Sequence, residues 1–77
     1  MTKLEVRHHY LNNLERRYAG QVDYSSGSRA RELAIKAADA ALAGQIKLEG
    51  EAWFAALKLA GLPKSATKAQ IAALPEA

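Results

Sequence analysis

The fold is decided by residues 28–44, which read SRARELAIKAADAALAG. Ser28 is a good helix N-cap and Gly44 a good left-handed C-cap, so we predict a helix from about Arg29 to Ala43. Its charged residues fall on one narrow stripe, made of Arg29, Glu32, Lys36 and Asp39. Apolar residues cover the other sides, among them Leu33, Ile35, Leu42 and several alanines. We therefore predict that this helix is buried on more than one side and is the central element of a bundle.

The segment before it predicts another helix, which ends near Gly20. Thr2 and Glu5 have the spacing of a capping box. The expected core face of this helix recurs at helical period and consists of Leu4, Leu11, Leu14 and Tyr18. Residues 20–28 are rich in turn-forming residues and form the longest predicted connection, although Gly20–Tyr24 could be locally extended.

Two further helices are expected after Gly44. One runs over roughly Leu48–Ala60 and ends at Gly61 and Pro63, with a core side made of Ala52, Trp53, Ala56, Leu57, Leu59 and Ala60, and with Ile46 leading in. A short one covers about Ala66–Leu74 and begins after Ser65 or after Thr67, where Thr67 and Gln70 again have capping-box spacing. The sequence thus predicts an all-α fold, a compact bundle of three main helices plus a short C-terminal helix, with residues 1–77 in a single small domain.

Composition narrows the class of protein. The chain has no cysteine, which excludes disulfides and thiolate chemistry and favours a cytoplasmic location. No stretch is long and apolar enough for a membrane span or a signal peptide, so we expect a soluble protein that does not enter membranes. The net charge of +3 comes entirely from the first 31 residues, and a second local surplus lies at Lys58, Lys64 and Lys68. A mild basic excess of this size often serves solubility alone.

No arrangement of residues indicates an enzyme. His8 and His9 are adjacent and point about 100° apart on a helix, which does not suit joint ligation of a metal. Glu49 and Glu51 are two residues apart and face different ways, so they do not form an acid–base pair. The serines at 25, 26 and 28 lack the spacing of a phosphate-binding loop. We predict no catalytic residues, no metal site and no cofactor.

Two helix starts carry basic residues where acidic ones are usual. Ser28, Arg29 and Arg31 open one helix, and Lys64, Ser65, Thr67 and Lys68 surround the start of the last. Free backbone N–H groups, hydroxyls and cations together favour a phosphate or carboxylate, so we predict anion or nucleic-acid binding at both places. The alternative is that these basic residues have no binding role and are simply tolerated at the helix starts, where their cost is small.

The stretch Leu57–Ile71 reads LKLAGLPKSATKAQI and resembles the SAP domain and its relatives among the HeH/LEM-like helix–loop–helix modules. The resemblance covers roughly the last third of the chain. It departs from the family pattern at Ala66, where glycine is usual, at Gly50, where an aliphatic residue is usual, and at Pro75, which shortens the second helix. It implies contact with DNA or RNA backbone, or with a protein in the LEM branch. Ligand-facing residues would be Lys64, Ser65, Thr67 and Lys68, and core residues Leu57, Leu62 and Ile71.

The aromatic residues offer a different kind of site. Trp53 and Phe54 are consecutive on a helix, so one of them should lie at a rim, and Phe54 falls on the polar side. An aromatic among charges suits a protein interface or a stacking platform, whereas packing beneath a neighbouring segment is the equally open alternative. Partner-binding candidates are Arg16, Arg17, Tyr24 and Phe54.

Two functions are consistent with these observations. The first is a small non-enzymatic protein that binds DNA or RNA backbone through basic helix starts. The second is a small regulator or inhibitor, of the kind that mobile elements often encode, which binds a protein partner. A homodimer is also plausible, because so short a chain has few large apolar groups to fill a core.

Overall fold

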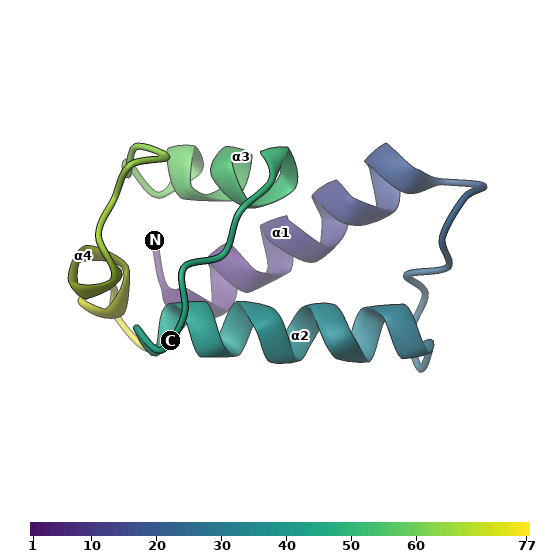
Figure 1. Cartoon of the computed structure of the whole chain (residues 1–77), viewed down its shortest axis with the longest axis horizontal. Coiled ribbons are helices and arrows are strands. Elements are labelled where there is room, and N and C mark those ends of the chain that lie inside the picture. Colours follow the sequence, from purple (N-terminus) through teal and green to yellow (C-terminus); the bar gives the residue numbers. More distant parts are fainter.

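Four helices and no strand make up the secondary structure of the computed structural model, which describes all of residues 1–77. They are α1 (Lys3–Tyr18), α2 (Arg29–Leu42), α3 (Glu51–Leu59) and the short α4 (Lys68–Ala72). The first three are the main helices of a body that measures 33 × 20 × 18 Å (Figure 1). The all-α prediction, with three main helices and a short fourth, is confirmed.

The predicted caps are present at three helix starts. Thr2 and Glu5 form a reciprocal capping box on α1, and Thr67 and Gln70 form one on α4. The Ser28 hydroxyl accepts the backbone N–H of Arg31 at 3.2 Å. These hydrogen bonds satisfy N–H groups that the helix itself leaves without a partner, which is why each helix begins at the predicted residue or within two of it.

Helix α3 begins three residues later than predicted. Gly50 precedes it with φ of 113° and offers no side-chain cap, so the backbone turns sharply there and the helix starts at Glu51 rather than Leu48. The short helix α4 covers Lys68–Ala72: it begins after Thr67, one of the two predicted starts, and ends two residues before the predicted Leu74. Thr67 caps α4, so the helix begins at Lys68. Pro75 follows soon after the last helical residue, Ala72, and cannot continue a helix.

The central element is α1 rather than α2, which corrects the prediction. Figure 1 shows α1 between α2 and α3; it packs against both, whereas α2 and α3 do not approach each other closely. The buried residues of α2 all lie on one face and are Ala34, Ala38, Ala41 and Leu42. The small alanines let α1 approach, and Leu33, on another side of α2, is exposed, so α2 is not buried all round.

The buried face of α1 also differs from the one predicted. Leu11 and Leu14 are buried as expected, but Leu4 and Tyr18 are exposed because they lie at the two ends of the helix. The remaining buried residues of α1 are Val6, Tyr10 and Asn13. Two apolar residues expected in the core around α3, Leu59 and Ile46, are likewise exposed, while Ala52, Trp53, Ala56 and Leu57 are buried.

Trp53 is the largest fully buried side chain and joins α3 to α1. Its ring lies edge-to-face on Tyr10 with centroids 5.3 Å apart. Burial raises the pKa of the Tyr10 hydroxyl. The indole Nε1–H has no hydrogen-bond acceptor, so the indole contributes to stability through packing.

A second link between α1 and α3 is polar. Asn13 is buried, and its Nδ2 donates to the backbone carbonyl of Ala52 at 3.1 Å. Its Oδ1 accepts from the Arg16 guanidinium. Because both ends of the amide are satisfied, Asn13 fixes the start of α3 against α1 without leaving a buried polar group unpaired.

The remaining contacts close one end of the bundle. Helix α4 packs against the end of α2 at Gly44, whose φ of +76° has the predicted left-handed conformation. A Cβ at Gly44 would lie 3.1 Å from the Cβ of Ala72. Nearby, the Lys3 backbone N–H donates to the Pro75 carbonyl at 2.7 Å, which ties the beginning of α1 to the last residues of the chain.

Acid is expected to weaken the start of α1. Hydrogen bonds from Thr2 lower the pKa of Glu5 from its ordinary value of 4.5. A carboxyl group whose pKa is lowered in the folded state stabilises that state above its unfolded pKa, and the contribution is lost as pH falls through the folded pKa. Glu5→Gln keeps the capping geometry but does not titrate.

The difference in Tm between the native chain and Glu5→Gln should therefore shrink as pH falls from about 6 to about 3 in thermal melts followed by circular dichroism. Subtracting the Glu5→Gln melts removes the effect of the other carboxyl groups. A difference that stays constant over this range would contradict the stabilising role of the ionised Glu5 side chain.

Candidate functional site

Three lysines without an ionic partner lie on the segment that runs from α3 into α4. Lys58, Lys64 and Lys68 are all exposed, and residues 52–75 contain no Asp or Glu. The only ion pairs in the structure are those of Lys3 and Arg7, so none of these three lysines forms an ion pair. We call the three exposed lysines the lysine face; one carboxylate, that of Glu51, lines a pocket together with two of them.

A pocket of about 420 Å³ opens beside two of these lysines. Its walls come from α3 and from the loop that follows, and they include Phe54, Leu62 and Pro63. Lys58 and Lys64 also line it. The structure thus brings Phe54, predicted as a protein contact or a stacking platform, to the same place as Lys64, predicted as an anion contact. Phe54 is half-buried: it packs against the core and also lines this pocket.

The loop between α3 and α4 presents the other residues that the resemblance implied. Ser65, Thr67 and Lys68 are exposed, whereas Ala66 is almost fully buried. The Thr67 oxygen accepts the Gln70 backbone N–H at 3.1 Å, which leaves its own O–H free to donate. Of the core residues expected in this region, Leu57 and Ile71 are buried and Leu62 is half-buried against the core.

The two arginines at the start of α2 do not form a joint binding site. Arg29 is exposed, but the Arg31 guanidinium turns back and donates to the Tyr24 carbonyl at 3.2 Å. Ser28 is occupied with capping the same helix. Arg31 therefore holds the 20–28 loop in place, and Arg29 is left as the exposed cation of this helix start.

The two predicted basic sites lie at opposite ends of the molecule. Figure 1 shows α4 at the end of α2 and the 20–28 loop at its start. The 14 residues of α2 separate them by about 20 Å, from a rise of ~1.5 Å per residue. A ligand that contacts both Arg29 and Lys68 must therefore extend along the whole length of α2.

The other partner-binding candidates lie near the 20–28 end. Arg17 is exposed, and Arg16 is exposed while donating to the Asn13 side chain. Tyr24 is half-buried against the core, with its ring 6.3 Å from that of Tyr18. Arg16, Tyr24 and Phe54 line three different pockets, so the structure does not bring the candidates together in one cavity.

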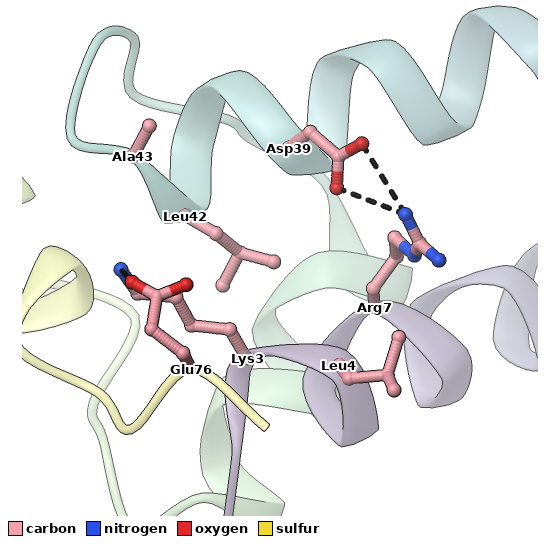
Figure 2. Close-up of a pocket in the computed structure, with 7 residues that line it drawn as sticks. All are labelled: Lys3, Leu4, Arg7, Asp39, Leu42, Ala43 and Glu76. Carbon is pink, nitrogen blue, oxygen red and sulfur yellow. Dashed lines mark hydrogen bonds and ion pairs between the residues drawn. The ribbon is translucent and has the colours of Figure 1, made fainter.

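A different pocket, of about 340 Å³, lies where α1 meets the end of α2 and the last residues of the chain (Figure 2). Figure 2 shows that its charged groups face each other in pairs. Arg7 Nη1 lies 3.2 Å from an Asp39 oxygen, and Lys3 Nζ lies 2.8 Å from Glu76 Oε1. Because each charge already has an opposite partner, we assign these groups to holding the three segments together. Ion pairs at the protein surface, with at least one partner in solvent as here, contribute about 0–1 kcal/mol each.

No family model, curated protein or solved structure matches this chain. No helix has the length and apolar character needed to cross a bilayer. The lysine face and its pocket are therefore interpreted from their own geometry.

Sequence reasoning missed part of this site. Lys58 stood out as local charge but not as a binding residue, and Pro63 stood out only as a helix terminator. Both line the Phe54 pocket, together with Glu51. The available signal was the helical spacing of Glu51, Phe54 and Lys58, which puts these three on one side of α3. The helical spacing could not predict that the loop with Leu62 and Pro63 folds back against this side of α3.

Proposed function

We propose that this chain binds nucleic acid, DNA or RNA, through the phosphate backbone and that the lysine face is the main contact. The observation that carries the proposal is that Lys58, Lys64 and Lys68 are exposed and have no carboxylate partner. Lysine ammonium groups bind phosphates and release condensed counterions, which supplies affinity without reading a base sequence. Ser65 and Thr67 lie between the lysines in sequence and offer hydroxyl donors to phosphate oxygens.

The test is a titration of the chain into labelled single-stranded and duplex DNA and RNA at about 50 and about 200 mM salt. Binding should weaken steeply with salt. Lys58→Glu/Lys64→Glu should lower affinity by about tenfold or more per lysine at the lower salt and should reduce the salt slope by about two.

The matched control is Lys36→Glu/Lys47→Glu, which changes net charge equally at exposed lysines outside the lysine face. Equal losses in the two double variants would mean that net charge, not this face, governs binding. Arg29→Glu tests the other end of the molecule and is preferable to a change at Arg31, which holds the 20–28 loop. No binding at the lower salt would refute the proposal.

A second candidate function, as a regulator or inhibitor that binds a protein, is favoured by a groove between α1 and α2. The groove has a volume of about 460 Å³, and its lining combines three apolar residues, Leu4, Leu11 and Ile35, with the polar residues Glu5, Arg7, His8, His9 and Arg31. Such a mixed lining suits a surface that brings both apolar and polar groups, such as a second copy of the chain. Sedimentation equilibrium over a range of concentrations, comparing the native chain with Leu4→Glu, tests self-association at this groove.

A further inference from the structure

The walls of the Phe54 pocket suit the base of a nucleotide better than its phosphate. Phe54, Leu62 and Pro63 present rings and an aliphatic side chain, none of which pairs with an anion. Flat apolar surfaces of this kind favour the face of a planar base. The two lysines that line the same pocket stand where the phosphates on either side of such a base could be neutralised.

An unpaired base can enter this pocket, whereas a base stacked inside a duplex cannot. Its volume is about 420 Å³, and Phe54 in its wall is held by contact with the core rather than exposed on a mobile loop. In a duplex the faces of the bases are stacked on one another, so a protein reaches them only by unstacking, which costs a few kcal/mol. A single strand offers its bases without that cost.

One acidic residue, Glu51, shares the pocket. Its carboxylate repels phosphate, so a backbone phosphate is unfavourable next to Glu51. A carboxylate can also accept a hydrogen bond from an amino group on a base edge. Glu51 is therefore compatible with a base in the pocket and unfavourable for a phosphate there.

We infer that the Phe54 pocket receives an unpaired base, with Lys58 and Lys64 on the flanking phosphates, so that the chain prefers single-stranded to duplex nucleic acid. This inference rests on the proposed function. It specifies the class of nucleic acid that the lysine face binds and adds base stacking to phosphate contact as a source of affinity.

The experiment compares three probes by fluorescence anisotropy at one salt concentration. They are a single strand of about 12 nucleotides, within the ~4–16 nucleotides that one binding fold covers, an abasic strand of the same length and charge, and a duplex of that length. The native chain should bind the base-bearing strand most tightly. Phe54→Ala should weaken that binding by about 5- to 150-fold, from ~1–3 kcal/mol per stacked base, and should leave abasic-strand binding unchanged.

Leu59→Ala is the matched control, because it removes an exposed apolar side chain from the same helix outside the pocket. Phe54→Leu keeps an apolar group against the core while removing the ring, so it separates stacking from folding, and it should also lose the preference for bases. Circular dichroism melts establish that each variant is folded.

The outcomes separate the two proposals. Equal binding of base-bearing and abasic strands by the native chain, or equal loss on both strands in the Phe54 variants, would overturn the base pocket while leaving backbone binding intact. Tighter binding of the duplex than of the single strand would do the same. Failure of the native chain to bind any probe would overturn both.

Discussion

Replacement of Trp53 with alanine is expected to remove about 3–5 kcal/mol of folding free energy, the usual cost of deleting a large aromatic side chain from a core. Trp53 is fully buried and links α3 to α1 through its edge-to-face contact with Tyr10. A domain of this length has a total stability of about 4–12 kcal/mol, at ~0.05–0.15 kcal/mol per residue. The variant should therefore lose a large part of its stability, and its Tm should fall by about 12–40 °C, at ~4–8 °C per kcal/mol.

Circular dichroism is the suitable measurement, because Trp53 is the only tryptophan and the variant has no tryptophan fluorescence to follow. Trp53→Phe is the matched control. It retains an aromatic ring and deletes an N–H that has no acceptor, so its loss should be well below that of Trp53→Ala. A Trp53→Ala chain within about 1 kcal/mol of the native one would contradict the central position of this side chain.

The second large effect is expected at Gly44, where alanine should cost about 2–3 kcal/mol. Part of this cost, about 1–2 kcal/mol, comes from a side chain at positive φ. The rest comes from crowding, because the new Cβ would lie 3.1 Å from the Cβ of Ala72 and 3.4 Å from the carbonyl oxygen of Lys68. Either α4 moves away from α2 or the end of α2 distorts, and both weaken the end of the bundle that carries Lys68.

Gly61 provides the control for backbone conformation. Its φ of +80° is close to the +76° of Gly44, but a Cβ added at Gly61 would have no neighbouring atom within 4 Å. Gly61→Ala should therefore show only the conformational cost. The difference between the two midpoints in urea unfolding measures the crowding by α4. Equal losses in both variants would show that α4 does not press on Gly44 in solution.

Local signals in the sequence predicted the starts of the capped helices α1, α2 and α4. Thr2 with Glu5, and Thr67 with Gln70, act over three residues, so their capping boxes could be recognised without knowledge of the rest of the fold. Gly44 was recognised in the same way. The late start of α3 was missed because Gly50 interrupts a pattern whose apolar spacing continues through Leu48.

The arrangement of the helices depended on contacts that no local pattern reveals. Asn13 donates to Ala52, 39 residues away, and this buried bond helps place α3 on α1 rather than on α2. Helix α2 was expected at the centre because alanine counts as apolar in a pattern, but a methyl group buries little surface compared with Tyr10 or Leu11 of α1. Size, more than spacing, decided which helix is central.

The same distinction applies to the candidate site. The excess of lysine after residue 52 and the polar setting of Phe54 were visible in the sequence. Their meeting in one pocket was not, because it depends on how the loop at Leu62 and Pro63 folds beside α3. At the start of α2 the sequence predicted one site from two arginines that the structure does not form, because Arg31 bonds to the Tyr24 carbonyl instead of lying beside Arg29.

The hydrogen bond between Lys3 and Pro75 has a practical consequence for engineering the chain. Since the two ends meet, a short flexible linker from residue 77 to residue 1 could close the chain into a ring without moving a helix. New ends could then be opened in the exposed stretch 25–27, at the far end of the long axis (Figure 1). Such a circular permutant would carry a fusion partner or a dye far from the lysine face.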